Sequence, residues 1–169
     1  MDNSQDLEAF VGQLQSSFEK SGLDLDQVTP FTPETLDSMY SIAYTLYEQG
    51  KYDHSASVFR ILALLEVDNR KHWMGLGASL KMLKHYDEAL KSYAFAAVLD
   101  ESDPLAHFHA AECFLAQGNV EKALTALDSA ETVSDGHACY QNLRQEISML
   151  RQIWIKSEPE THYLKTQGA

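Results

Sequence analysis

Apolar residues recur along this chain at helical spacing, and the same arrangement returns every 34 residues. The repeats occupy three consecutive segments: 36–69, 70–103 and 104–137. In each segment two amphipathic stretches flank a short polar turn. A period in this range is typical of proteins built from stacked helical units. Each segment is therefore predicted to fold as helix, turn, helix.

Small residues occupy two fixed positions of each segment, the eighth and the twentieth. These residues are Ala43, Gly77, Ala111, Ser55, Ala89 and Ala123. Two antiparallel helices cross closely only where neither has a bulky side chain, so these positions predict the helix crossings. Larger apolar residues should surround each crossing and form the core. In the first helix the predicted inner stripe consists of Met39, Ile42, Ala43 and Leu46.

The ends of the predicted helices also have recognisable residues. Thr32 is well placed to cap the first repeat helix, with Pro33 as its first residue. Two of the three turns contain Gly50 and Gly118, where a helix C-terminus favours a left-handed residue. The middle turn, Lys84-His85-Tyr86, has no glycine.

Two more amphipathic helices are predicted outside the repeats. Residues 1–35 contain one, followed by a connector, and its apolar face consists of Leu7, Phe10, Val11, Leu14 and Phe18. Because this face has little else to pack against, one hypothesis is that Phe10, Val11, Leu14 and Phe18 form a homodimer interface. Residues 138–156 contain the other helix, which should cap the end of the array with Leu143, Ile147, Leu150 and Trp154. Residues 157–169 are polar, and we expect a flexible tail.

Composition excludes several classes of partner. The chain has 13 Lys and Arg against 25 Asp and Glu, a net charge of −12, which disfavours nucleic acid and anionic membranes. Its most apolar stretch, 93–99, is too short to insert into a bilayer. The N-terminal residues do not resemble a secretory signal, and the two cysteines are isolated. We therefore expect a cytoplasmic protein.

The sequence has no pattern typical of catalysis or of a cofactor site. It contains no phosphate-binding glycine loop, nucleophile elbow or Cys-x-x-Cys pair. The densest cluster of candidate ligands is His107, His109, Glu112 and Cys113. On a helix the two histidines lie about 200° apart, so they cannot share a metal, and ordinary packing accounts for the cluster. We predict no enzyme activity, no metal and no cofactor.

The first repeat helix has a second stripe, of tyrosines. Tyr40, Tyr44 and Tyr47 follow one another at helical spacing on a face that packing within the repeat does not require. In a stacked array this face would line a concave groove. The equivalent residues of the next two units are Met74, Ala78, Lys81, Phe108, Glu112 and Leu115. Tyrosine offers a large apolar area and a hydroxyl for a peptide backbone, so an extended apolar segment is the expected ligand.

A permanent cover is the alternative to a free groove. The N-terminal helix or a second copy of the chain would then bury the tyrosines. We favour the groove because large exposed apolar patches usually mark interaction sites.

The period, the small crossing residues and the pattern of Trp73, Leu76, Gly77, Ala89 and Tyr93 resemble the tetratricopeptide repeat family. This resemblance implies an all-α solenoid of three helix-turn-helix units, with the N-terminal helix and the C-terminal cap added. Many members grip the carboxylate of a heat-shock chaperone with Lys and Asn in the first unit. Here Tyr40 and Tyr44 occupy those positions, so that use is not expected.

A narrower resemblance rests on Gln49-Gly50-Lys51-Tyr52, Gly75-Leu76-Gly77-Ala78 and His109-Ala110-Ala111-Glu112-Cys113. These motifs, with the acidic charge and the N-terminal helix, resemble the class II chaperones of bacterial type III secretion. The family implies a cytosolic chaperone that uses no nucleotide and holds hydrophobic translocator proteins before export. A short client segment containing Pro and Leu would lie in the concave groove. A generic tetratricopeptide adaptor, which assembles a protein complex, remains the alternative.

Overall fold

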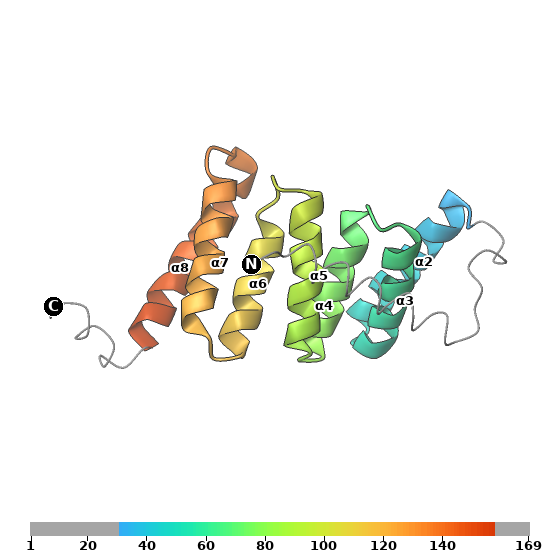
Figure 1. Ribbon diagram of the computed structural model, residues 1–169, viewed down its shortest axis with the longest axis horizontal. Helices are drawn as coiled ribbons and strands as arrows, with labels where there is room; N and C mark the ends of the chain where they lie inside the picture. Colours follow the sequence, from blue (N-terminus) through green and yellow to red (C-terminus); the bar gives the residue numbers. More distant parts are fainter. Residues whose placement is uncertain (1–30, 158–169) are drawn as a thin grey trace, which may run out of the picture. The chain divides into compact units, whose positions relative to one another are not determined.

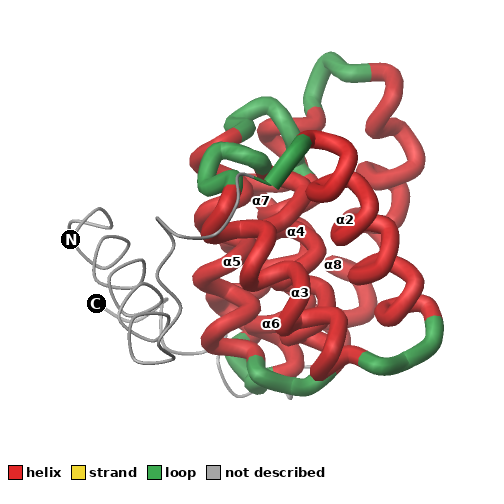
Figure 2. The backbone as a smooth tube through the Cα atoms, turned by 90° about the vertical axis from the view of Figure 1, so that its right-hand side faces the viewer, coloured by secondary structure: helices red, strands yellow, loops and turns green. Residues whose placement is uncertain are grey.

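The computed structural model of the chain describes residues 31–157, in which the regular elements are helices joined by turns and no strand occurs (Figure 1; Figure 2). The chain divides into two compact units between Asp100 and Glu101. The first unit contains α2 (Pro33–Glu48), α3 (Tyr52–Leu65), α4 (Arg70–Met82) and α5 (Tyr86–Leu99). The second contains α6 (Leu105–Ala116), α7 (Val120–Ser134), the short 3-10 helix η2 (Ala138–Tyr140) and α8 (Gln141–Ser157). The all-α prediction is confirmed; the helix predicted within 1–35 lies outside the described residues.

The three predicted turns share one backbone geometry. Gly50 and Gly118 have φ angles of 75° and 77°, in the left-handed region predicted for them. Lys84 takes the same conformation at φ 62°. In each turn this residue and the next donate to carbonyls at the end of the preceding helix, as in Lys84 N to Lys81 O, 3.0 Å. The middle turn therefore keeps the geometry of the other two without a glycine.

The six small residues predicted at the helix crossings are all buried. Gly77 shows why size matters, because a Cβ there would lie 2.7 Å from the ring of Tyr93. Gly75 is equally constrained, since its Cβ would lie 2.4 Å from the ring of Phe59. At the α2–α3 crossing the Ser55 hydroxyl donates to the carbonyl of Ala43 at 2.9 Å, so the one polar side chain there is satisfied.

Aromatic stacking fixes the second helix pair. Trp73 of α4 and Phe95 of α5 stack with ring centroids 4.3 Å apart and planes within 6° of parallel. The Trp73 indole also donates to the carbonyl of Val67 at 2.8 Å, which ties the end of the α3–α4 turn to α4. Both contacts lie within the first unit.

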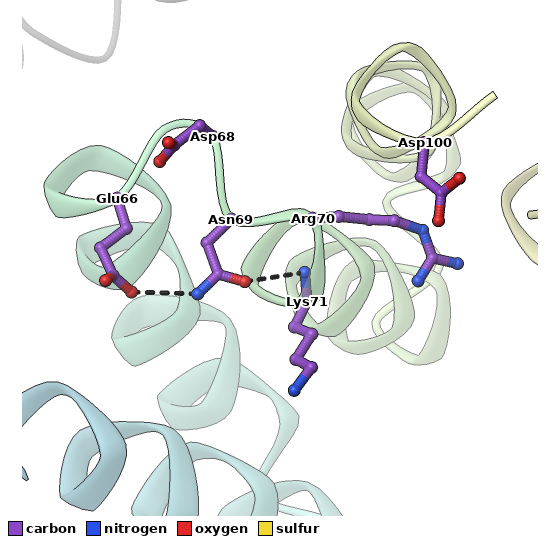
Figure 3. Close-up of a pocket in the computed structure, with 6 residues that line it drawn as sticks. All are labelled: Glu66, Asp68, Asn69, Arg70, Lys71 and Asp100. Atoms are coloured by element: carbon purple, nitrogen blue, oxygen red, sulfur yellow. Dashed lines mark hydrogen bonds between the residues drawn. The ribbon is translucent and has the colours of Figure 1, made fainter. Parts of the chain in front are cut away.

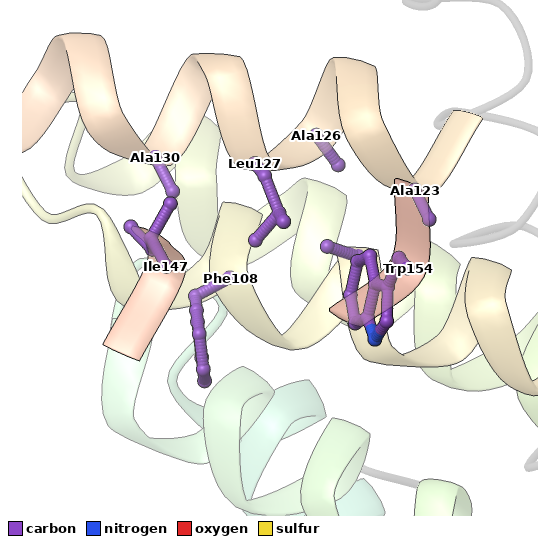
Figure 4. Close-up of a cluster of buried hydrophobic side chains, with 8 residues drawn as sticks. Phe108, Ala123, Ala126, Leu127, Ala130, Ile147 and Trp154 are labelled. Atoms are coloured by element: carbon purple, nitrogen blue, oxygen red, sulfur yellow. The ribbon is translucent and has the colours of Figure 1, made fainter. Parts of the chain in front are cut away.

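The predicted C-terminal cap packs as expected on α7 (Figure 4). Ile147 and Trp154 of α8 join a buried cluster with α6 and α7, and Leu143 and Leu150 pack against it. Arg151 adds ion pairs to Asp128 at 2.7 Å and to Glu131 at 2.8 Å on α7. Arg144 donates to the carbonyls of Ser134 and His137 and so satisfies the end of α7. The helix prediction for 138–156 is thus close to the observed bounds.

One residue of the predicted inner stripe does not lie in the core. Ala43 is buried at the crossing with α3, and Met39 and Leu46 are half-buried, but the Ile42 side chain is 55% exposed. The reason is geometric: each residue turns about 100° around a helix, and Ile42 points to a side of α2 on which no described element packs. The expectation that Ile42 packs inside the repeat is wrong for the described part of the chain.

Candidate functional site

The three tyrosines of α2 differ in their surroundings. Tyr44 is 50% exposed, whereas Tyr40 and Tyr47 are half-buried. Tyr47 packs edge-on against Tyr52 of α3, with ring centroids 5.3 Å apart. The expectation that packing within the repeats does not use this stripe is therefore wrong for Tyr40 and Tyr47. Tyr44 is the member whose ring is most available to a ligand.

Tyr40 is held by residues of two other helices. Its ring meets Phe59 of α3 edge-on at 5.6 Å between centroids and lies 6.0 Å from the imidazole of His72 on α4. Phe59 is itself placed by Gly75, whose missing side chain leaves room for the ring. The orientation of Tyr40 thus depends on both α3 and α4.

The surface of α2 around the tyrosines has no charge. No charged residue occurs between Asp37 and Glu48. The exposed hydroxyls of Ser38, Ser41 and Thr45 donate to carbonyls one turn earlier on the same helix, at 2.7 to 2.9 Å. The hydroxyl protons are therefore already satisfied without water. Covering this face of α2 with a ligand costs little free energy of desolvation.

The second predicted set comes from α4, which contacts α2 in the same unit. Met74, Ala78 and Lys81 are all half-buried, so part of each side chain is accessible. The first unit therefore contains six of the nine predicted groove residues.

The third set lies on α6, in the second unit. The Phe108 side chain is buried in the hydrophobic cluster with α7 and α8, and Leu115 packs against that cluster. The Glu112 carboxylate is 2.8 Å from Nδ1 of His109, its neighbour on α6. Phe108 is thus far less accessible than Tyr44, whereas Glu112 and Leu115 are half-buried.

The candidate metal ligands do not form a group of three. Within residues 31–157 no three side chains of His, Cys, Asp or Glu are grouped to hold a metal ion. Cys113 is buried and Cys139 is exposed. Burial lowers the pKa of His107.

A polar pocket of about 500 Å³ lies beside the α3–α4 turn (Figure 3). Its lining mixes both signs of charge and consists of Glu66, Asp68, Asn69, Arg70, Lys71 and Asp100. Asn69 bridges the pocket wall, because its side chain donates to Glu66 at 3.0 Å and accepts from the Lys71 backbone N–H at 3.2 Å. None of the predicted groove residues lines this pocket.

Comparison with known proteins identifies the family. The tetratricopeptide repeat profile matches residues 40–93 and 79–138. The low calcium response locus protein H of Yersinia pestis is 33% identical over 145 residues, which are 85% of this chain and 86% of that protein. The chain belongs to the type III secretion translocator chaperones.

Solved structures of other translocator chaperones share the fold. SycD of Yersinia enterocolitica, in complex with a peptide of the translocator YopD, is 34% identical with a TM-score of 0.70, over 77% of this chain and 100% of that chain. PcrH of Pseudomonas aeruginosa, in complex with the chaperone binding region of PopD, is 27% identical with a TM-score of 0.73, over 77% and 98% of the two chains. In the present translocator chaperone, no helix of residues 31–157 has the length and hydropathy needed to cross a bilayer.

Sequence reasoning did not single out His72. This residue is 3% exposed and touches Tyr40, one of the residues predicted to line the groove. The available signal was its place beside Trp73 and one helical turn before Leu76, both of which are apolar. Periodicity alone does not show which helix such a histidine faces, because that depends on contacts distant in sequence.

Proposed function

We propose that this chain is a cytoplasmic chaperone that holds a hydrophobic translocator before export by covering a short extended segment of it that contains Pro and Leu. The observation that carries the proposal is Tyr44, a half-exposed aromatic side chain on an uncharged face of α2. Two relatives, SycD and PcrH, have been solved with translocator segments, which supports the same class of client.

In this mechanism the chaperone covers an apolar segment of the client and catalyses no reaction. An apolar client segment gains about 25 cal/mol for each Å² of apolar surface that leaves water, and the tyrosine rings supply such surface. Tyrosine hydroxyls add hydrogen bonds to the client backbone, which an extended segment cannot satisfy internally. The covered client is kept from aggregation and from premature membrane insertion, so the chain needs neither catalysis nor a cofactor.

We assign the client contacts to both units. Tyr40, Tyr44 and Tyr47 with Met74, Ala78 and Lys81 form the contribution of the first unit. Phe108, Glu112 and Leu115 form that of the second. Phe108 is buried and so offers a client much less surface than Tyr44 does.

Co-purification of a translocator tests the proposal. The tagged chain is co-expressed with YopD, PopB or PopD, the translocators bound by SycD and PcrH. At least one should co-purify with the wild type and be lost or strongly reduced with Tyr44→Ala. Ile42→Ala is the matched control, since Ile42 is equally exposed on α2 but points about 200° away from Tyr44. Circular dichroism should show the same helicity for all three proteins.

Two results would contradict the proposal. One is retention of the client by Tyr44→Ala and by the triple alanine variant of Tyr40, Tyr44 and Tyr47. The other is a client that stays soluble and intact without the chaperone, which is the behaviour expected of an adaptor's partner.

The segments have separate roles in this proposal. Residues 36–137 bind the client, 138–156 cap the second unit, and 1–35 allow self-association through Phe10, Val11, Leu14 and Phe18, all of which lie outside the described residues. SycD has been solved in an alternative dimer form, which supports self-association as a property of the family. An unchanged sedimentation mass for Phe10→Asp would contradict this assignment.

A further inference from the structure

We propose that His72 is a positioning residue for Tyr40 and that client binding is consequently sensitive to protons. The inference rests on the proposed function, since it assumes that Tyr40 contacts the client. His72 itself is too buried to touch a ligand and acts through the tyrosine.

The geometry makes His72 one of two walls that hold the Tyr40 ring. Phe59 of α3 provides the first wall and cannot retreat easily, because it lies over Gly75 in the space where a Cβ would be. The imidazole of His72, on the first turn of α4, provides the second at 6.0 Å between centroids. A shift of this imidazole therefore frees the Tyr40 ring on its α4 side.

Burial favours a neutral His72 imidazole, although one of its polar contacts is a carboxylate. Its Nε2 lies 3.5 Å from a carboxylate oxygen of Glu66, which already accepts a hydrogen bond from Asn69 at 3.0 Å. Its Nδ1 is buried and has no hydrogen-bond partner in the described part of the chain. The backbone carbonyls of Leu62 and Glu66 raise the pKa of His72, but burial has the larger effect and the net shift is downward.

The surrounding charges do not reverse this preference. Burial is the largest influence and lowers the pKa of His72, and Lys71 on α4 lowers it further. Glu66, at the end of α3, acts in the opposite direction and offsets only part of the effect. From α2 the phenol of Tyr40 faces the imidazole. The neutral form of His72 is therefore favoured in the packed arrangement, and the protonated form is favoured where the imidazole reaches water.

The direction in which pH changes client affinity depends on which form of His72 each arrangement of Tyr40 contains. The packed arrangement holds the neutral imidazole, and the arrangement that loosens Tyr40 holds the protonated one. A client that needs Tyr40 in place binds the neutral form better, so protons compete with it. Affinity should be constant above the ordinary histidine pKa of about 6.5 and should fall as the pH drops below it.

Titration calorimetry with the YopD peptide as probe, at pH 7.5 and 5.5, tests this expectation. The wild type should lose about threefold or more in affinity at the lower pH, within the change that linkage allows for one histidine. His72→Phe should bind with little dependence on pH. His107→Phe is the control, because it removes a half-buried histidine on α6 whose pKa burial also lowers, and it should keep the wild-type pH dependence. Equal pH dependence in His72→Phe and the wild type would overturn the inference.

A second measurement does not depend on the client. In the free protein with ¹³C-labelled tyrosine rings, the NMR signals of Tyr40 should shift with the same midpoint as those of His72, while Tyr44 should not follow. Where His72→Phe folds poorly, His72→Gln serves as the neutral variant, and its Tyr40 signals should not titrate. A Tyr40 signal that is constant through the His72 transition would overturn the inference. Failure of the YopD peptide to bind at pH 7.5, with PopB and PopD also failing to co-purify, would instead contradict the proposed function.

Discussion

Lys84 is the only non-glycine residue with a left-handed backbone in the described part of the chain. Its φ of 62° is close to those of Gly50 and Gly118 at the same position of their repeats, and its hydrogen bonds are the same. A side chain in this region clashes with its own backbone, whereas glycine does not. The repeat geometry therefore determines this turn, and Lys84 accepts a strained conformation to complete it.

Replacing Lys84 by Gly should raise the free energy of unfolding. We expect a gain of up to about 1 kcal/mol, because the removed backbone strain exceeds the extra entropy of glycine in the unfolded chain. Urea denaturation at pH 7.5 measures the change. The converse variant, Gly118→Lys, is a suitable control. A Cβ at Gly118 meets no atom within 4 Å, so backbone strain is the effect that this substitution adds to the folded state. Destabilisation by Lys84→Gly would contradict the explanation.

At the scale of the helices, local signals were sufficient to predict most elements. Thr32 caps α2 and Pro33 begins it, as the sequence indicated. The four apolar residues predicted to anchor the C-terminal cap all pack in or against the α8 cluster. Ile42 is an exception. Periodicity predicts which residues form an apolar stripe on a helix, but not which side of that stripe contacts another helix. The contacts of Tyr40 with Phe59 and His72 join residues far apart in sequence, so they required the folded structure.

The α8 helix should stabilise the second unit through its inner face alone. Trp154 is buried in the cluster, and Trp154→Ala should reduce the free energy of unfolding by about 3 to 5 kcal/mol. Ile153 is its direct neighbour but is 60% exposed, so Ile153→Ala should change stability by less than about 0.5 kcal/mol. Thermal or urea unfolding followed by circular dichroism distinguishes the two. Similar losses for both variants would show that α8 packs through a different face.

At the scale of the whole molecule, the acidic charge and the apolar face complement each other. The chain has a net charge of −12, yet residues 38–47 of α2 contain no charged side chain. Net charge keeps a protein soluble while it displays an apolar binding surface. The groove position of Tyr44 remained a prediction from the repeat register, and its exposure in the folded chain makes it the most direct site at which to test client binding.

Site-specific photo-crosslinking tests the central claim most directly. The photoreactive residue p-benzoylphenylalanine is placed at Tyr44, and in separate variants at Ile42 and Ile153, which are also exposed. Each variant is co-expressed with YopD, irradiated and analysed for a covalent product of chaperone and translocator. The account predicts a strong product from position 44 and little from the other two. No product at position 44, with a strong product at either control position, would contradict it.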